Sequence, residues 1–205
     1  VTTANINSVT GLYVAFQSIS DLTGIEDFIA LVVLDCNHNL LSSVDVSNNV
    51  ALTTLTFYNN QLTSLDVSSN IALEYLDCES NQLTSLDISQ NTALTFAHCA
   101  SNLLTSLDVS NGNNVNMTLL ANGNNNLFCI EVDDVAWSTS NWATIDPQHY
   151  FSNNCSGTTE TEEYAKNKEP LRIIDILGRE SKLKKNQPLF YLYSDGTIEK
   201  KIINE

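Results

Sequence analysis

No lysine and no arginine occur in residues 1–165 of this 205-residue chain, although that stretch carries 18 aspartates and glutamates. A surface without cations cannot neutralise phosphates, which argues against nucleic acid as a partner of this part of the chain. An anionic membrane would repel it, whereas a basic partner or a cation would be attracted. All nine basic residues fall between Lys166 and Lys201, and residues 166–205 contain six acidic ones. The charge therefore divides the chain into a body of net charge −18 and a tail of net charge +3.

Proline and glycine are also scarce, at 3 and 7 residues, which argues against a disordered or fibrous chain. The apolar runs are only a few residues long, so we expect no insertion into a membrane. The signatures of a nucleophile elbow, a phosphate-binding glycine loop and an HExxH zinc helix are missing. His98 and Cys99 are neighbours, but adjacent side chains on a strand point to opposite faces and cannot share a metal. We therefore predict a non-enzymatic protein with no cofactor and no metal ion.

The sequence is rich in one feature, an internal repeat. Four units of equal length run head to tail from Leu31, Leu52, Leu73 and Leu94, the third reading LEYLDCESNQLTSLDISQNTA. A weaker unit starts at Met117 after a slip of two residues, and another weaker one precedes them from Val9. About six rungs result, which exceeds the three or so that a solenoid needs.

Each column of the repeat has a physical interpretation. A single rung cannot bury its apolar side chains, but stacked rungs can. One predicted core column contains Leu34, Leu55, Leu76, Ala97 and Leu120. Asparagines recur where the chain turns, at Asn39, Asn60, Asn81, Asn102 and Asn125. We expect these amides to be buried and to satisfy backbone groups left free by the turns.

Two short stretches in each unit alternate between apolar and polar residues, as in LEYLDC and LTSLDVS. A period of two over four to six residues predicts β-strands, and no part of the repeat shows a helical period. The fold class is therefore mostly β: a solenoid of about six rungs of 21–23 residues. One side should carry a parallel sheet with rungs about 4.8 Å apart, and the other should carry shorter strands or turns.

The repeat also resembles known families. The pattern LxxLxCxxNxL resembles leucine-rich repeats, and LTSLDVSxNxAL is similar to the short repeats of surface proteins in bacteria with a type IX secretion system. The resemblance covers roughly residues 5–155. It implies a protein that is secreted or displayed on the cell surface of a bacterium, and whose repeats bind another molecule.

Three of the five cysteines, Cys36, Cys78 and Cys99, share one column, in which Phe57 takes the fourth place. We expect them to be small buried side chains with inert thiols. Cys129 and Cys155 fit no column and bracket the end of the repeat. In an oxidising compartment they should form a disulfide that stabilises this segment by roughly 3 kcal/mol.

Residues 126–155 leave the repeat and carry a bulky apolar load that includes Trp137 and Trp142. An end rung exposes the edge of its core, so this segment is predicted to cap the solenoid within a domain spanning 1–155. Residues 156–170 are polar and charged and are interpreted as a linker.

The tail, residues 171–205, contains three predicted strands, LRIIDI, LFYLY and TIEKKII, with a hairpin-turn signal at Ser194-Asp195-Gly196. It is similar to the C-terminal sorting signals of type IX secretion substrates, with Leu177-Gly178-Arg179 at the matching place. That resemblance implies the secretion machinery as a partner, and often removal of the tail. The alternative is a small β unit that docks on the acidic solenoid through its lysines.

A row of acidic residues also recurs, one in each unit: Asp45, Asp66, Asp87, Asp108 and Glu131. Stacked about 5 Å apart, neighbours repel by about 0.8 kcal/mol even in bulk water. Either hydrogen bonds from nearby serines and turn amides or a row of cations such as calcium would compensate. The lack of the glycine-rich turns of calcium-binding solenoids favours the hydrogen bonds.

The candidate binding surface is the solvent-facing side of the first strand in each unit, where residues vary while the framework does not. Tyr58, Tyr75 and Phe96 are expected to cluster on three successive rungs, on the concave face of the sheet. The same face includes Asp35, Thr56, Asp77, Glu79 and His98. Exposed aromatic residues near the middle of a sheet are typical of interface centres. We predict binding of an extracellular protein, for example from a host; the alternatives are a spacer without a ligand and a carbohydrate-binding module.

Overall fold

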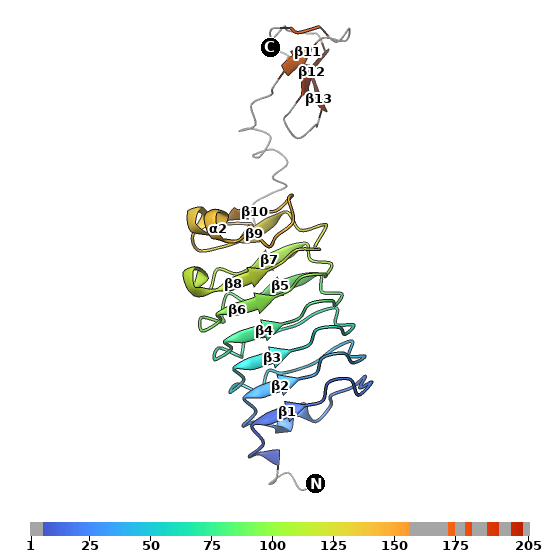
Figure 1. Ribbon diagram of the computed structural model, residues 1–205, viewed down its shortest axis with the longest axis vertical. Coiled ribbons are helices and arrows are strands. Elements are labelled where there is room, and N and C mark those ends of the chain that lie inside the picture. The colour runs from blue at the N-terminus through green and yellow to red at the C-terminus, as the bar shows by residue number, and fades with distance from the viewer. Residues whose placement is uncertain (1–5, 156–171, 175–178, 182–187, 193–197, 203–205) are drawn as a thin grey trace. The chain divides into compact units, whose positions relative to one another are not determined.

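A computed structural model describes residues 6–155, 172–174, 179–181, 188–192 and 198–202 (Figure 1). The chain divides into two compact units, residues 1–155 and residues 156–205. The segment 156–170, interpreted above as a linker, lies outside the described residues.

The first unit is a parallel β-solenoid of about seven turns, which confirms the predicted fold class. Its larger sheet contains six parallel strands in the order β1-β2-β3-β4-β6-β8, stacked along the solenoid as Figure 1 shows. These are β1 (Gly11–Tyr13), β2 (Val33–Asp35), β3 (Thr54–Thr56), β4 (Tyr75–Asp77), β6 (Phe96–His98) and β8 (Thr118–Leu120). Each strand is short, because every rung must turn to reach the opposite side.

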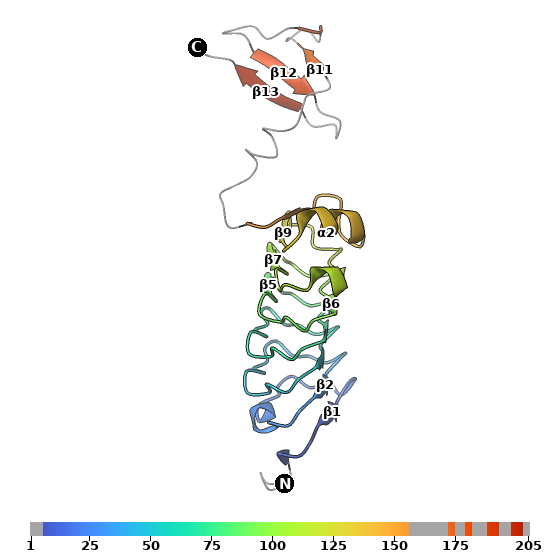
Figure 2. The same ribbon diagram turned by 90° about the vertical axis from the view of Figure 1, so that its left-hand side faces the viewer.

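The second sheet lies on the opposite side of the rungs (Figure 2) and is also parallel. It contains β5 (Ser85–Asp87), β7 (Ser106–Asp108), β9 (Cys129–Glu131) and β10 (Tyr150–Ser152). Strand β10 pairs with β9 in register, Tyr150 with Cys129, so the capping segment adds a rung that the repeat count missed. Short helices complete the rungs: η1 (Ile25–Asp27), η2 (Asn114–Asn116) and α2 (Val135–Asn141).

The middle residue of each of these strands points into the core. Leu34, Leu55, Leu76 and Ala97 are fully buried, as the column analysis predicted. The fifth member is Leu119, however, because Ala97 pairs with Leu119 and the side chain of Leu119 is 2 % exposed. The prediction of Leu120 was wrong. It assumed that the two-residue slip before Met117 shifts the strand by two residues, whereas the pairing of Ala97 with Leu119 shows a shift of one.

The predicted asparagine column forms a ladder of amide hydrogen bonds. Asn60 shows the pattern: its Nδ2 donates to the carbonyls of Cys36 and Phe57, both at 2.9 Å, and its Oδ1 accepts from the Leu41 amide at 3.1 Å. Asn39, Asn81, Asn102 and Asn124 repeat it. The last member is the buried Asn124, so the prediction of Asn125, which is exposed, was wrong for the same one-residue reason.

A left-handed residue precedes each of these asparagines, three residues after the strand of that rung ends. The column contains His38, Asn59, Ser80, Ser101 and Gly123, with φ between 52° and 76°, and Phe16 holds the same position before Gln17. This conformation costs a non-glycine residue roughly 1 kcal/mol, and it turns the chain so that the next asparagine points inward. The hydrogen bonds of the following asparagine side chain therefore offset the conformational cost of the left-handed residue.

A second asparagine ladder, which the sequence analysis missed, runs along the other corner of the rungs. Asn70 Nδ2 donates to the carbonyls of Val46 and Asn49, both at 3.0 Å, and Asn49 and Asn91 make equivalent pairs of bonds. The Oδ1 atoms of Asn49, Asn70 and Asn91 are buried without a hydrogen-bond partner. Asn49, Asn70 and Asn91 recur at the spacing of the repeat, and this regularity could have predicted the second ladder from the sequence.

The end of the solenoid is closed as predicted. Asp134 caps α2 by accepting a hydrogen bond from the Trp137 amide at 2.9 Å. Trp142 is 6 % exposed, packs edge-on against Trp137, and donates from Nε1 to the carbonyl of Met117 at 3.0 Å. The carboxylate of Asp146 accepts from the amides of Gly123 and Asn124, and Cys129 and Cys155 are joined by a disulfide. The tryptophans thus cover the open edge of the core.

The second unit contains a three-stranded antiparallel sheet made of β11 (Arg172–Ile174), β12 (Pro188–Leu192) and β13 (Ile198–Ile202). The three strands predicted for the tail are confirmed. Leu189 and Tyr191 are buried, and Ile173 packs against them. The predicted turn at Ser194–Gly196 and the pair Leu177-Gly178 lie outside the described residues.

The column of free thiols should be unreactive towards alkylating reagents in the folded chain. Cys36, Cys78 and Cys99 are completely buried. Burial disfavours the thiolate and raises the pKa of Cys36 and of Cys99 to about 12, and it raises the pKa of Cys78 as well. Because the thiolate is the reactive form, iodoacetamide at pH 8 should modify none of the three in the folded chain and all three in guanidinium. Mass spectrometry would read this out, and alkylation of any of them in the folded chain would contradict it.

Candidate functional site

The residues predicted from the sequence meet on the outward face of the six-stranded sheet, which we call the sheet face. The first and third residues of each strand point outward from it. Strand register aligns Asp35, Thr56, Asp77 and His98 in one row across β2, β3, β4 and β6. Tyr75 and Phe96 are direct partners in the adjacent row. Six of the eight predicted residues therefore occupy two neighbouring rows, and Tyr58 and Glu79 follow two residues beyond them in the chain.

Tyr75 and Phe96 form a stacked aromatic pair. Their ring centroids are 4.6 Å apart and the ring planes differ by 6°. Both side chains are half-buried, because each covers the other and the strand backbones beneath. Burial, together with the nearby Asp77 and Tyr58, raises the pKa of the Tyr75 hydroxyl.

Tyr58 does not join this stack. Its ring lies edge-on to His38, with centroids 4.8 Å apart, and His38 stacks on Phe16 at 4.1 Å. The reason is its place in the rung: Thr54 pairs with Tyr75, so Tyr58 is four residues past that row. The predicted cluster of three aromatic residues is therefore two groups, Tyr75 with Phe96 and Tyr58 with His38 and Phe16.

Sequence reasoning missed Phe16 and His38 as members of this surface. Both belong to the left-handed column, and Phe16 is 68 % exposed. A bulky aromatic residue in a left-handed turn is rare and carries a conformational cost, which is more often found at binding sites than elsewhere. Phe16 and His38 are one rung apart in the sequence, so their equivalent positions could have been predicted. Their left-handed conformation could not.

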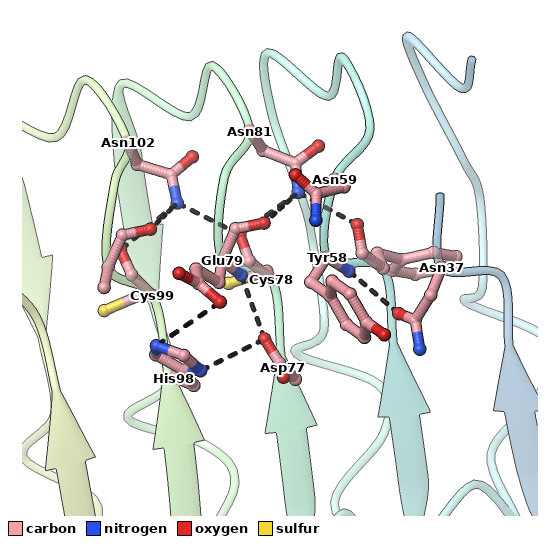
Figure 3. Close-up of polar contacts among 12 residues, drawn as sticks. Asn37, Tyr58, Asn59, Asp77, Cys78, Glu79, Asn81, His98, Cys99 and Asn102 are labelled. Carbon is pink, nitrogen blue, oxygen red and sulfur yellow. Dashed lines mark hydrogen bonds and ion pairs between the residues drawn. The ribbon is translucent and has the colours of Figure 1, made fainter. Parts of the chain in front are cut away.

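His98 lies between two carboxylates, as Figure 3 shows. Its Nδ1 is 3.5 Å from Asp77 Oδ1, and its Nε2 is 3.8 Å from Glu79 Oε2. Asp77 is only 8 % exposed, whereas Glu79 and His98 are half-buried. The ring of Phe96 stands edge-on to the imidazole with centroids 6.2 Å apart. These contacts restrict the imidazole from two sides.

The backbone holds the acidic groups of the sheet face in place. Asp77 Oδ1 accepts a hydrogen bond from the Glu79 amide at 3.1 Å, and Asp35 Oδ1 accepts one from the Asn37 amide at 3.2 Å. Asn37 Oδ1 in turn accepts from the Tyr58 amide at 3.0 Å. The residues where β2, β3 and β4 end are thus ordered by hydrogen bonds within and between rungs.

The acidic row on the opposite side accepts hydrogen bonds from backbone amides. Asp45, Asp66 and Asp87 each accept a hydrogen bond at 2.9 Å from the amide of the serine two residues later, and Asp108 does the same. The hydroxyl and amide of Ser47 hold the pKa of Asp45 below its usual range, and those of Ser68 do so for Asp66. Glu131 accepts from the Cys155 amide at 3.2 Å. These hydrogen bonds compensate for the repulsion between the stacked carboxylates.

Similar solved structures share this fold. The functional domain of InlJ from Listeria monocytogenes, which includes a cysteine ladder, is 32 % identical with a TM-score of 0.56, and the match covers 78 % of this chain and 42 % of that one. Internalin C2 from the same organism is 16 % identical with a TM-score of 0.53, covering 76 % of this chain and 78 % of that one. The LRIM1/APL1C complex is 24 % identical with a TM-score of 0.51, covering 71 % of this chain and 32 % of that one.

No protein-family profile and no curated protein matches the sequence. The repeat, the solenoid and these likenesses define a leucine-rich-repeat fold. It is similar to the bacterial internalins and spans 42 % of the InlJ chain that it matches. Among the residues that the structure describes, no helix is both long and apolar enough to cross a membrane.

Proposed function

We propose that the protein is a secreted or cell-surface bacterial recognition module that binds an extracellular protein through the sheet face. The observation that carries this proposal is the stacked pair Tyr75 and Phe96, flanked by the carboxylates of Asp77 and Glu79. Large aromatic side chains held rigidly near the middle of a surface are typical binding hot spots. Stacking between the two rings on directly paired strands holds them in place before a partner arrives, which reduces the entropy lost on binding.

Charge indicates the chemistry of the partner. Residues 1–165 offer no lysine or arginine, and the acidic groups Asp35, Asp77 and Glu79 accompany the aromatic pair on the sheet face. A partner surface that carries lysine or arginine close to an apolar patch would complement it. Electrostatic attraction of this kind raises the association rate and weakens with salt.

The experiment compares two double variants of the full chain. Tyr75→Ala/Phe96→Ala removes the aromatic pair, and Ser85→Ala/Ser106→Ala changes the equivalent exposed positions of β5 and β7 on the other sheet. Partners captured from serum or matrix extracts by wild type would be identified, and their affinities measured with both variants. We expect the aromatic variant to lose about 100-fold or more in affinity, as for two hot-spot residues, and the serine variant to match wild type.

Two alternative functions have distinct outcomes in the same experiment. Equal recovery of partners by wild type and the aromatic variant would favour a spacer without a ligand on this face. A signal on a glycan array without a protein partner would favour a carbohydrate-binding module that uses the same aromatic rings. Either result would overturn recognition of a protein by Tyr75 and Phe96.

The compartment and the tail form a second part of this proposal. The disulfide between Cys129 and Cys155 fits an oxidising environment outside the cytoplasm. The separate antiparallel sheet of β11, β12 and β13 fits a segment recognised by the type IX secretion machinery, which the sequence resemblance suggested. Deletion of residues 171–205 should then leave the protein inside the cell, as judged by fractionation and immunoblotting. Unchanged export would contradict this role for the tail.

A further inference from the structure

We propose that Asp77, Glu79 and His98 form a binding site for one divalent transition-metal ion, with zinc as the best match to the ligand set. The site lies on the sheet face across strands β4 and β6. It shares Asp77 and Glu79 with the proposed protein-binding surface but does not include the aromatic pair Tyr75 and Phe96. From the sequence we expected no metal ion, because His98 and its neighbour Cys99 point to opposite faces of the strand.

The strand register creates the site. Asp77 and His98 are direct partners on adjacent strands, so their side chains leave the same face. Glu79 is two residues after Asp77 and therefore points to that face as well. One ligand atom from each of the three residues lies within 4.8 Å of the other two. Among the described residues, no other group of three or more histidines, cysteines and carboxylates comes together in this way.

The three ligand atoms must move closer together to coordinate an ion. Zinc binds imidazole nitrogen and carboxylate oxygen at about 2.0–2.2 Å, which places tetrahedral ligands about 3.3 Å apart. The His98 to Asp77 contact is 3.5 Å and the His98 to Glu79 contact is 3.8 Å. These two contacts use different ring nitrogens, so the imidazole must rotate to present one nitrogen between the carboxylates. Glu79 is half-buried and has room to follow.

Charge supplies an independent reason for a cation here. Asp77 is 8 % exposed, so its carboxylate has lost most of its water. Residues 1–165 provide no lysine or arginine to neutralise it, and its ion-pair partner among the described residues is His98. A buried carboxylate is costly unless a cation pairs with it. A divalent ion bound between Asp77 and Glu79 removes that cost and the repulsion between the two groups.

The ligand types select the class of ion. Calcium and magnesium prefer sets made only of oxygen, whereas one imidazole with two carboxylates suits zinc and its neighbours in the first transition row. Three protein ligands leave the fourth tetrahedral position open, as in sites where water or an incoming group completes the coordination. The Glu79 amide bonded to Asp77 Oδ1 and the Phe96 ring beside His98 orient two of the three ligands.

The test is a calorimetric titration of the full chain with zinc after treatment with a chelator. We expect one ion per wild-type chain at this site, and cobalt should give a visible absorption band from nitrogen and oxygen ligands. His98→Ala and Glu79→Gln should each lose that equivalent, or weaken it by at least about 10-fold. His38→Ala is the matched control, because His38 is on the same face without a carboxylate pair, and it should bind as wild type does.

Glu79→Gln guards against a folding artefact, since the glutamate is half-buried and its replacement keeps the side-chain shape. Thermal unfolding of each variant would show that it is folded before titration. The proposal is overturned if wild type takes up no zinc, or if His98→Ala and Glu79→Gln bind as much and as tightly as wild type. Equal binding of calcium and zinc would also overturn it. None of these results bears on Tyr75 and Phe96 as a protein-binding pair, because no partner is present.

Discussion

Replacing Asn60 with alanine should reduce the free energy of unfolding by about 3 kcal/mol. The Leu41 amide donates to Asn60 Oδ1, whereas the carbonyls of Cys36 and Phe57 accept from Asn60 Nδ2 and also from Asn39 and Asn81. The variant therefore leaves the buried Leu41 amide without a partner, which costs about 1–3 kcal/mol, and removes two further hydrogen bonds. Urea denaturation followed by circular dichroism measures the change, with the slope of the transition checked for loss of cooperativity.

The two asparagine ladders provide a matched comparison for this prediction. Asn70 donates to two carbonyls that each also accept from a backbone amide, and its own Oδ1 lacks a partner, so Asn70→Ala should cost about half as much. Asn48 is exposed, and Asn48→Ala should change stability by less than about 0.5 kcal/mol. If Asn60→Ala were no more destabilising than Asn48→Ala, the amide ladder would not be what fixes the turns.

Removing the disulfide with Cys129→Ser/Cys155→Ser should destabilise the cap by about 3 kcal/mol. The two cysteines are separated by 26 positions in the chain, and closing a loop of that length restricts the unfolded state by roughly this amount. The segment between them contains α2 and both tryptophans, Trp137 and Trp142, which cover the open edge of the core. Loss of the bond therefore weakens the part of the solenoid that protects the last rung from solvent.

Tryptophan fluorescence reports on the cap alone, because the chain has only these 2 tryptophans. In the double variant the fluorescence transition should move to lower urea than the circular dichroism transition of the whole solenoid. Reductant should reproduce the shift in wild type and should have no further effect on the variant. Superimposable fluorescence transitions for wild type and variant would show that the disulfide contributes nothing to the cap.

The sequence predicted the fold well where a column is strictly periodic. Leu34, Leu55, Leu76 and the ladder from Asn39 to Asn102 follow from the constant spacing of the repeat, because stacking makes equivalent positions neighbours. The errors, Leu120 and Asn125, both come after the slip before Met117. The sequence gives the number of inserted residues but not the part of the rung in which they lie. Here the short helix η2 accommodates part of the insertion.

The candidate site was predicted less completely, because it depends on contacts between rungs that are not equivalent. The outward direction of Tyr75, Asp77, Phe96 and His98 follows from strand alternation. The stack of Phe16 on His38 depends on left-handed backbone at residues that rarely adopt it, which no pattern in the sequence indicates. The approach of His98 to two carboxylates depends on register across strands and on rotamers, and neither can be read from one chain position at a time.

The constant spacing between rungs also bears on how the chain folds. Paired strands in the six-stranded sheet are separated by almost the same length of chain throughout, from Leu12 with Leu34 at the start to Ala97 with Leu119 near the end. Each new rung therefore closes a loop of the same short length onto a surface that already exists. A solenoid of this kind grows from a nucleus of two or three rungs by repeated addition, and the entropic barrier of each addition does not increase with the number already formed.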